Sequence, residues 1–556
     1  MTVRGTEMES TTLAHSTADA ASADAAIIAE AAAVTISHRS LADSIERLAG
    51  VLRCAGLRPG DAVALVLPNG PELLVLFLAL ARARLIAAPL NPAYRGDELR
   101  WLFKDVQAHA IVTTVGNGVV AGAAAGLGAP VWLASMDPSG NVSLAGVPRT
   151  SRGGPEMPDA EDVALFLHTS GTEGRPKVVP LTHTNVLRSA QHIASHYGLT
   201  PADRSLIVLP LFHGHGLIGA ALATLVSGGA VIVPPRFSAS RFWKSFRSHR
   251  ASWYSAVPTI HQILLERADA DGAPHGGARF IRSCSEALAP AVLSALERRF
   301  GAPVVEAYGL TEAAHQVASN PLPPRERKSG TVGPGVGAEV AIIDSTGRHL
   351  PPHGAGEVVI RGQGVMHGYH DNPAADAAVF VDGWLRTGDL GVLDDDGYLT
   401  LKGRIKEMIN RGGEKVAPRE IDEALLKGCG GTVPRIAPHL TVGLVRLLVG
   451  RRQERAIMLP GECLPMQIVR PRQPRLARAL ATTVLGEQVG RACDQQQRRG
   501  PRGKGGRSDH MAGPRQQRSR GRICDHSTQK TTRWLIVPGT SLKQAGPSPD
   551  SESASV

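Results

Sequence analysis

Short apolar runs rich in β-branched residues alternate with longer helical patterns along residues 36–426. The runs with the length and composition of buried strands lie at residues 61–68, 110–114, 163–168, 206–210 and 230–234. The helical patterns that separate several of them lie at residues 71–88, 216–226 and 258–267. Strands that alternate with helices in this way build largely parallel sheets covered by helices. The pattern therefore predicts the α/β fold class.

After residue 331 the pattern changes to shorter strands and tight turns. Strands are expected at residues 339–343, 357–361, 390–393 and 398–401. The last two are joined by three aspartates and Gly397, and an acidic cluster that ends in glycine between two apolar runs is typical of a hairpin. We expect a small β-rich subdomain in this part of the chain.

The two ends of the chain differ in composition from the rest. Residues 1–35 are rich in Ala, Ser and Thr, and we interpret them as a mobile leader. Residues 429–556 are rich in Arg, Gln, Gly and Pro, and Trp534 is their single aromatic residue. A segment of this kind buries too little apolar surface to offset its chain entropy. We therefore expect a basic, low-complexity, disordered tail.

The formal net charge of +11 on the 556 residues is unevenly distributed. Residues 431–556 hold 22 Lys and Arg against 8 Asp and Glu, whereas the remainder has a balance of −3. The main body therefore gives no reason to expect a nucleic-acid partner. The longest apolar run has nine residues, at 73–81, and a membrane-spanning helix needs about 20. With no secretory signal pattern and six scattered cysteines, we expect a cytoplasmic protein without a membrane partner.

The first candidate site is the string HTSGTEGRPK at residues 168–177, directly after a predicted strand. Glycines let backbone N–H groups approach a polyphosphate, hydroxyls donate hydrogen bonds and one lysine supplies a cation. The string does not match the common P-loop. We interpret it as a nucleotide-binding loop whose candidate residues are Thr169, Ser170, Gly171, Thr172, Glu173, Gly174 and Lys177.

This loop resembles the phosphate loop of the adenylate-forming superfamily, in which Thr is usual at the position of Glu173. Members of that superfamily join a carboxylate to AMP, and most then pass the acyl group to coenzyme A. The resemblance implies an AMP-binding N-terminal domain at residues 36–403. It implies ATP and Mg²⁺ as cofactors and coenzyme A as co-substrate, with catalytic roles for Thr172 and Lys177.

Two further motifs, AYGLTE at 307–312 and WLRTGD at 384–389, resemble the adenine and ribose motifs of the same superfamily. The resemblance places Tyr308 and Gly309 at the adenine and Thr311 at a phosphate. It makes Glu312 a catalytic residue and the Mg²⁺ ligand, and a hard carboxylate oxygen suits that ion. It assigns Asp389 to the ribose, because a carboxylate can accept hydrogen bonds from both hydroxyls.

The string GRIKE at residues 403–407 resembles the hinge between the two domains of the superfamily. It implies that Arg404 contacts ribose and phosphate, and that Lys406 is a catalytic residue at the hinge. The stretch 404–428 then resembles only the start of the C-terminal lid, so the resemblance implies an incomplete lid. The terminal catalytic lysine of the superfamily is not assigned to Lys504, because the surrounding motif is missing.

Within the superfamily, the strings PLFHGHG at 210–216, IRSCS at 281–285 and TEAAH at 311–315 resemble plant and fungal oxalate–CoA ligases. The resemblance implies a pocket for a small carboxylate in which His213, Ser285 and His315 bind the substrate. Glu286 stands where the pattern has a small residue.

Three alternatives remain open on the sequence. One is a 4-coumarate or fatty-acid type of CoA ligase. Another is a catalytically impaired nucleotide-binding homologue without the lid lysine. The third is a protein that binds nucleic acid or an anionic surface through its basic tail. The sequence leaves the oligomeric state open.

Overall fold

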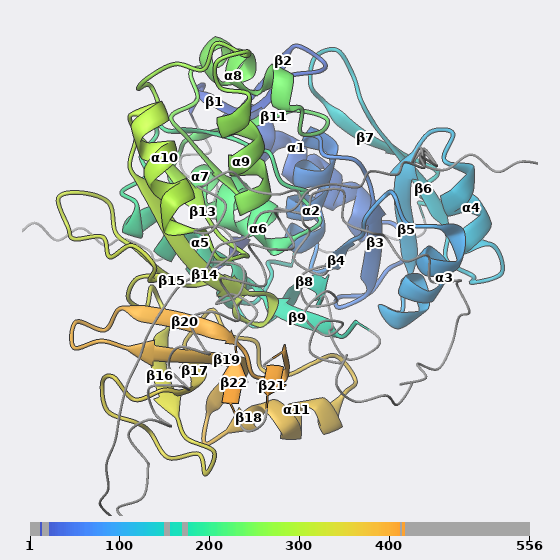
Figure 1. Cartoon of the computed structure of the whole chain (residues 1–556). Coiled ribbons are helices and arrows are strands. Elements are labelled where there is room, and N and C mark those ends of the chain that lie inside the picture. The colour runs from blue at the N-terminus through green and yellow to red at the C-terminus, as the bar shows by residue number, and fades with distance from the viewer. Residues whose placement is uncertain are drawn as a thin grey trace, which may run out of the picture. The chain divides into compact units, whose positions relative to one another are not determined.

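The structure is a computed structural model that describes residues 12–13, 22–149, 156–169, 176–407, 409–411 and 414–416. These residues belong to one compact unit of the chain (Figure 1). The predicted tail, most of the predicted lid and the loop residues 170–175 lie outside the described part. The described strands form three larger sheets and one two-stranded pair, and helices cover two of the sheets.

The first sheet has seven strands in the order β7-β6-β5-β3-β4-β8-β9. Its strands are β3 (Ala62–Val66), β4 (Ile86–Pro89), β5 (Ala110–Thr114), β6 (Val131–Met136), β7 (Val142–Ala145), β8 (Val163–His168) and β9 (Val178–Thr182). The five central strands pair in parallel, and the edge strands β7 and β9 are antiparallel to their neighbours. The fully buried strand β3 reads AVALV, as expected for a strand covered on both faces.

The second sheet has eight strands in the order β15-β14-β13-β12-β10-β11-β1-β2. Its strands are β1 (Ala25–Ala29), β2 (Val34–Ser37), β10 (Arg204–Leu206), β11 (Ala230–Val233), β12 (Trp253–Ala256), β13 (Phe280–Ser283), β14 (Val304–Leu310) and β15 (His315–Ser319). Its central strands are again parallel, and β2 and β15 close the two edges in antiparallel pairs. The predicted α/β fold with largely parallel sheets is confirmed.

The folded body begins before the boundary predicted at residue 36. Strand β1 pairs in parallel with β11, and Ile27 lies opposite Val231. Ala26 and Ile27 are completely buried. The Ala-rich composition suggested a leader, but the apolar residues AAIIA gain more by completing the sheet than they would by remaining in water.

The third sheet contains β16 (Glu339–Ile343), β17 (Gly356–Arg361), β18 (Phe380–Val381), β19 (Trp384–Leu393) and β20 (Leu399–Arg404). It is antiparallel, and it is coloured yellow to orange in Figure 1. Strands β19 and β20 form the predicted hairpin around the acidic turn, where Lys328 bridges Asp394 and Asp396. The β-rich subdomain is thus present. A separate pair joins β21 (Ile409–Arg411) and β22 (Glu414–Val416).

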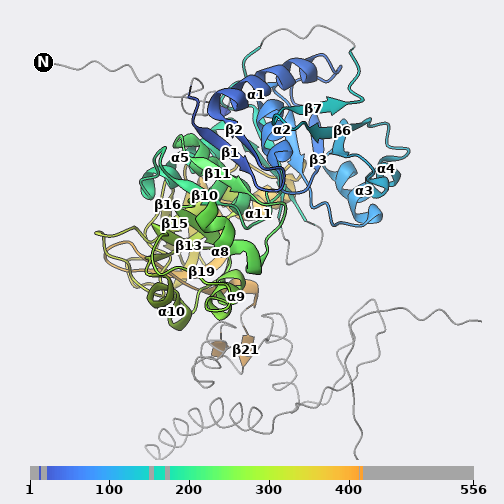
Figure 2. The same ribbon diagram turned by 90° about the horizontal axis from the view of Figure 1, so that it is seen from above.

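The helices lie between the strands, and α1 and α2 pack against each other beside the first sheet (Figures 1 and 2). The longer helices are α1 (His38–Arg53), α2 (Pro71–Arg82), α3 (Gly96–Asp105), α5 (His183–His196), α8 (Ala239–Ser248), α9 (Pro258–Glu266) and α10 (Pro290–Phe300). The short ones are α4 (Gly118–Ala124), α6 (Gly214–Gly216), η2 (Leu217–Leu222), α7 (Ala223–Val226), η3 (Thr311–Ala313), α11 (Pro373–Val379) and η4 (Ile405–Glu407).

The helix predicted at residues 71–88 ends earlier than expected. Helix α2 stops at Arg82, and Arg84 adopts a left-handed backbone conformation with φ of 61°. Residues from Ile86 then form strand β4. The apolar residues on both sides of this turn are buried, so hydrophobicity alone did not mark the change from helix to strand.

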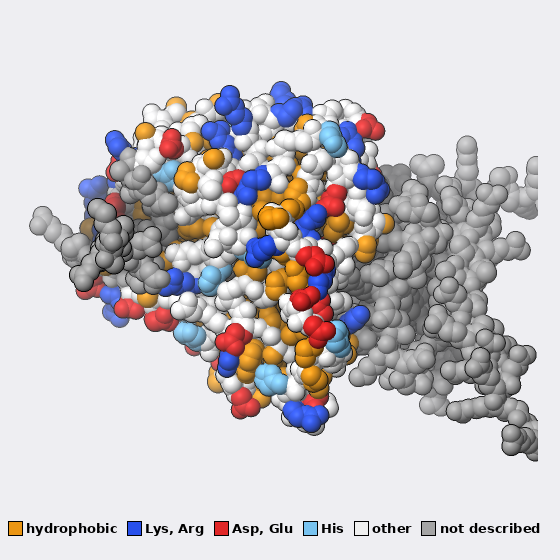
Figure 3. All heavy atoms as spheres, turned by 90° about the vertical axis from the view of Figure 1, so that its left-hand side faces the viewer, with side chains coloured by type: hydrophobic (Ala, Val, Ile, Leu, Met, Phe, Trp, Pro, Cys, Tyr) orange, Lys and Arg blue, Asp and Glu red, His pale blue; other side chains and the backbone are white. Residues whose placement is uncertain are grey.

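Acidic and basic side chains lie next to each other on the face shown in Figure 3, with apolar side chains between them. This mixed surface fits the near-neutral balance of the main body. Among the described helices, none has the length and apolar character required to cross a bilayer.

His183, the first residue of α5, is completely buried, and its Nδ1 accepts a hydrogen bond of 3.2 Å from the backbone N–H of Leu13. Burial lowers the pKa of His183 from 6.5 to about 4, although the nearby Asp162 acts in the opposite direction. Between pH 6.5 and about 4, His183 is therefore protonated in the unfolded chain and neutral in the folded chain. The stability contribution is complete above pH 6.5 and is lost as the pH falls toward 4.

We expect protonation of His183 in the unfolded chain to lower the free energy of unfolding by about 2 kcal/mol when the pH falls from 7 to 5. Urea unfolding of the native chain and of His183→Gln at both pH values measures the difference. The glutamine variant should lose about 2 kcal/mol less than the native chain. Equal losses in both proteins would contradict the assignment.

Candidate active site

Tyr308, Asp389 and Arg404 come together where the small sheet meets the second sheet. The hydroxyl of Tyr308, on β14, donates a hydrogen bond to Oδ2 of Asp389 on β19. The other carboxylate oxygen, Oδ1, lies 3.1 Å from Nε of Arg404, at the end of β20. Burial raises the pKa of Asp389, while Arg404 acts against that increase. Burial and the Asp389 charge hold the pKa of Tyr308 far above its usual value, so Tyr308 remains a donor.

Lys177 and Glu312 both contact Tyr369, a residue that the sequence analysis did not select. Nζ of Lys177 lies 4.5 Å from the centre of the Tyr369 ring. The Tyr369 hydroxyl donates a hydrogen bond of 2.9 Å to Oε1 of Glu312. The tyrosine thus brings a cation that directly precedes β9 and a carboxylate of η3, from distant parts of the chain, into one cluster. Such a pair suits a polyphosphate and the divalent cation that accompanies it.

The two ends of the predicted phosphate loop are joined by a pair of hydrogen bonds. The backbone N–H of Thr169 donates to the carbonyl of Lys177 at 3.0 Å. The backbone N–H of Lys177 donates to Oγ1 of Thr169 at 3.2 Å. The candidate residues between them, Ser170, Gly171, Thr172, Glu173 and Gly174, lie outside the described residues.

Gly309 separates Tyr308 from the residues around Glu312 and permits a close approach of two strands. A Cβ atom at Gly309 would lie 1.5 Å from the carbonyl oxygen of His315 on β15. Thr311 begins the turn η3, and its carbonyl accepts a hydrogen bond from the N–H of Ala314. The tight connection between β14 and β15 therefore holds Tyr308, Glu312 and His315 within eight residues of one another.

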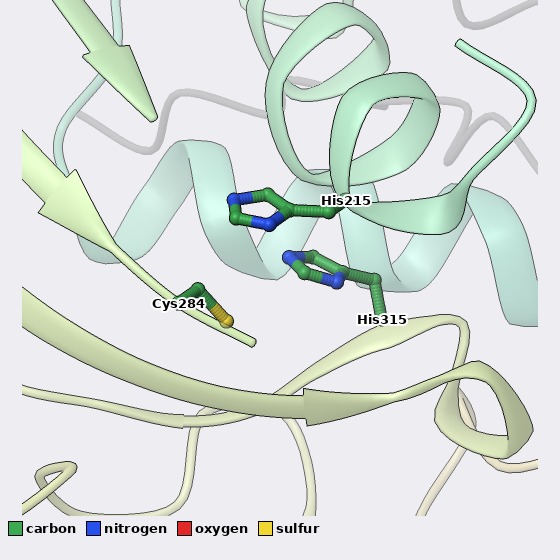
Figure 4. A group of neighbouring side chains, drawn as sticks. All are labelled: His215, Cys284 and His315. Atoms are coloured by element: carbon green, nitrogen blue, oxygen red, sulfur yellow. The ribbon is translucent and has the colours of Figure 1, made fainter. Parts of the chain in front are cut away.

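A second polar cluster surrounds His215 and His315, whose rings stack with centres 4.8 Å apart (Figure 4). Nδ1 of His215 lies 2.9 Å from Oγ of Ser285, and Nε2 lies 2.7 Å from Oγ of Ser255. Arg282, on β13, donates to both Oγ of Ser255 and Nε2 of His315. Burial, together with the Arg282 charge, holds the pKa values of both histidines far below the ordinary value.

His215, Cys284 and His315 offer ligand atoms within 4.8 Å of one another, which is the spacing of a possible metal site (Figure 4). Their surroundings oppose a cation. Nε2 of His315 already accepts from the guanidinium of Arg282, and both nitrogens of His215 face serine hydroxyls. A buried positive charge with hydroxyl and imidazole donors suits an anion instead.

Of the predicted substrate residues, the structure brings Ser285 and His315 into this cluster and leaves His213 outside it. His213 is exposed at the start of α6, and its ring packs on Phe212. His215, two residues later, is buried and belongs to the cluster. Lys406 lies exposed in η4, two residues after Arg404.

The residues that the sequence analysis missed carry weak local signals. Arg282 interrupts the apolar strand FIRS, and a charged residue within a buried strand indicates a functional site. The string HGHG offers two histidines, and helix periodicity over so short a segment does not tell which one is buried. Nothing in the sequence around Tyr369 indicates that it reaches Glu312, which lies 57 positions away.

Comparisons with known proteins agree with this arrangement. The family described as AMP-binding enzyme matches residues 15–370. An oxalate–CoA ligase from Arabidopsis thaliana is 47% identical over 401 residues, which cover 70% of this chain and 78% of the relative. A sulfoacetate–CoA ligase from Cupriavidus necator is 40% identical over 403 residues, covering 71% and 78%. The crystal structure of ATP-bound MatB from Rhodopseudomonas palustris has a TM-score of 0.67 and 31% identity, covering 77% of this chain and 84% of that one.

The matched segment contains Lys177, Tyr308, Glu312 and both stacked histidines. The structural match extends over most of each chain. The resemblance noted from the motifs is thereby confirmed, and this chain belongs to the family of AMP-binding enzymes.

Proposed function

We propose that this chain is an ATP-dependent ligase that converts a short diacid to its acyl adenylate and transfers the acyl group to coenzyme A, with oxalate as the favoured acid. The observation that carries the proposal is the position of the Arg282–His315 cluster. His315 of this cluster follows Glu312 by three residues along the chain, and Arg282 donates to it from β13. The names of the relatives agree, because oxalate and sulfoacetate both carry a second acidic group.

The residues present fit ATP with Mg²⁺. Asp389 is a buried carboxylate that accepts hydrogen bonds and so could receive ribose hydroxyls. Glu312 is a half-buried carboxylate whose Oε1 is held by Tyr369, and hard oxygen ligands of this kind hold Mg²⁺. When bound, Mg²⁺ neutralises charge on the phosphate oxygens. Lys177 supplies a further positive charge near the same place.

In the first half-reaction, a carboxylate oxygen of the acid forms a bond to the α-phosphorus and the bond to pyrophosphate breaks. The chain contributes by orientation and electrostatics. The nucleoside of ATP is held by Asp389, Tyr308 and Arg404. Its polyphosphate is held by Lys177 and Glu312. In the second half-reaction the thiol of coenzyme A displaces AMP, and Lys406 lies at the proposed hinge for that change.

The substrate pocket favours a short anion over an aromatic or aliphatic acid. His215 and His315 are buried and hydrogen-bonded, and Arg282 adds a full positive charge. An apolar acyl chain beside them would offer no acceptor to the exposed Ser285 hydroxyl and no negative charge to the buried guanidinium, and each polar group left without a partner costs about 1–3 kcal/mol.

ATP–pyrophosphate exchange with oxalate, acetate, 4-coumarate and a medium-chain fatty acid tests the proposal. We expect exchange with oxalate to exceed exchange with the other acids by at least about tenfold, since the pocket discriminates by paired buried polar groups. Oxalyl-CoA formation measured by mass spectrometry tests the second step. Preference for 4-coumarate or for the fatty acid would overturn the substrate assignment, and absence of exchange with every acid would overturn the activity.

A further inference from the structure

Arg282 is a completely buried guanidinium whose hydrogen-bond partners include no carboxylate, and the thiol of Cys284 also lies beside it. Nε donates to the Tyr197 hydroxyl at 3.0 Å, and Nη1 donates to Oγ of Ser255 at 2.9 Å. Nη2 donates to Nε2 of His315 at 2.9 Å and to Oε1 of Gln316 at 2.7 Å. Within the described ranges, no Asp or Glu forms an ion pair with it. A buried charge without a counter-ion is costly, so the site has an unmet preference for an anion.

The guanidinium fixes the proton of His315. Arginine has donors and no acceptor, so Nε2 of His315 must accept the bond from Arg282. The ring is neutral because burial and the arginine charge lower its pKa. The proton of the neutral ring therefore lies on Nδ1, and His315 has a donor on the side away from Arg282.

The same guanidinium fixes the proton of His215 through Ser255. The Ser255 hydroxyl accepts from Arg282, and His215 is its other hydrogen-bonding partner among the described residues. The Ser255 hydroxyl therefore donates its proton to Nε2 of His215. Nε2 is then the acceptor, so the ring of His215 carries its proton on Nδ1. Nδ1 then donates to Ser285, which is exposed and keeps its hydroxyl proton for another acceptor. Two hydrogen-bond chains thus start at one buried cation.

Backbone strain supports a functional role for the ends of these chains. Ser285 has φ of 76° and His315 has φ of 90°, both in a region that side chains rarely adopt. Gly219 on η2 leaves the space that the His315 ring occupies, since a Cβ there would lie 2.4 Å from Cδ2 of that ring. The fold thus holds these two side chains in place despite unfavourable backbone conformations at both residues.

We propose that Arg282 is the positioning residue for substrate specificity, which orients the Ser285 hydroxyl and the Nδ1–H of His315 as donors to the second acidic group of a short diacid. The proposal rests on the proposed function for its substrate, whereas the tautomers that it requires exist without substrate. A monocarboxylate lacks the second acidic group and should gain little from this arrangement.

The test compares Arg282→Met with the native chain and with Arg279→Met. Methionine preserves most of the buried volume, and removing a buried charge together with its desolvation cost often leaves folding intact. Arg279 lies three positions earlier, pairs with Asp203 at 3.0 Å and, among the described residues, forms no hydrogen bond with either histidine, so it is the matched control. Circular dichroism and thermal stabilisation by ATP verify that each variant is folded.

We expect Arg282→Met to raise the KM for oxalate in ATP–pyrophosphate exchange about 10–100-fold, with kcat changed less than threefold. The kcat/KM for acetate should stay within about threefold of the native value, so the oxalate-to-acetate ratio falls. Arg279→Met should keep the native ratio. An unchanged ratio in Arg282→Met would overturn the role in specificity.

Nitrogen-15 NMR of histidine-labelled protein gives a readout that is independent of activity. In the native chain, His215 and His315 should both show the Nδ1–H tautomer, with signals assigned by their absence in His215→Gln and His315→Gln. In Arg282→Met, at least the His315 signal should shift toward a mixture of tautomers. Unchanged signals would overturn the positioning role. If no acid supports exchange while the tautomers change as expected, the proposed activity is wrong and the positioning role stands.

Discussion

Replacing Glu312 by Gln should abolish Mg·ATP-dependent adenylation while leaving the fold intact. The amide oxygen can still accept the hydrogen bond from Tyr369, so the change removes charge with little change in shape. The uncharged amide is a much poorer ligand for Mg²⁺ than a carboxylate. We expect ATP–pyrophosphate exchange to fall by about 10³-fold, which corresponds to about 4 kcal/mol of lost transition-state stabilisation.

A binding measurement separates the metal from the nucleotide. Thermal stabilisation by ATP without Mg²⁺ should be similar in native and Glu312→Gln protein, and the additional stabilisation by Mg²⁺ should be lost in the variant. Glu266→Gln, at an exposed carboxylate that ends α9, is the matched control and should behave as the native chain does. Exchange at more than about a tenth of the native rate in Glu312→Gln would contradict a catalytic role for this carboxylate.

The parts of the fold that could be predicted are those in which local pattern and burial agree. Strands β5 and β8 occupy the predicted residues, because short runs made mainly of apolar residues, AIVTT and VALFLH, suit a strand that is buried on both faces. The prediction fails at α2, where burial extends through the following turn. It fails at β1 as well, whose pairing with β11 joins residues about 200 positions apart. Local sequence carries no information on such a partner.

The candidate site divides in the same way. Motifs with strict residue requirements identified Lys177, Tyr308, Glu312, Asp389 and Arg404, and the structure gathers these residues into two clusters. Residues that act through contacts from other elements were missed. Tyr369 reaches Glu312 only because the loop after β17 folds back on η3, and Met366 in that loop donates its N–H to the Glu312 carbonyl at 2.8 Å.

The structure also shows which of the two histidines of the string HGHG belongs to the polar cluster, whereas the role of His213 in substrate binding stays a prediction. Both histidines of HGHG follow a buried strand, and either could face a pocket. His213 precedes the helical turn and points to solvent, whereas His215 lies inside the turn and faces β12 and β13. The backbone path alone decides between them. Arg282 then follows as a partner of His215 through Ser255, and it could not be assigned before that contact was known.

Gly309→Ala should be the most destructive single methyl addition near the site. The added carbon would lie 1.5 Å from the His315 carbonyl oxygen and 2.6 Å from its carbonyl carbon, and both atoms are backbone. Strands β14 and β15 pair here, with Leu310 opposite His315, so relief requires the strands to separate. That movement displaces Tyr308 on one side and the His315 ring on the other. We expect a loss of about 3–5 kcal/mol of unfolding free energy together with exchange activity for every acid.

Gly122→Ala provides the matched control, because a Cβ on this residue of α4 meets open space and the residue is already helical. That variant should be unchanged or more stable by up to about 1 kcal/mol, since alanine restricts the unfolded chain. Urea unfolding and ATP–pyrophosphate exchange on both variants measure the contrast. If Gly309→Ala matched Gly122→Ala in stability and activity, the close approach of β14 and β15 would be wrong. The link between the nucleotide residues and the Arg282–His315 cluster would then lose its structural basis, because that approach pairs the strand of Tyr308 with the strand of His315.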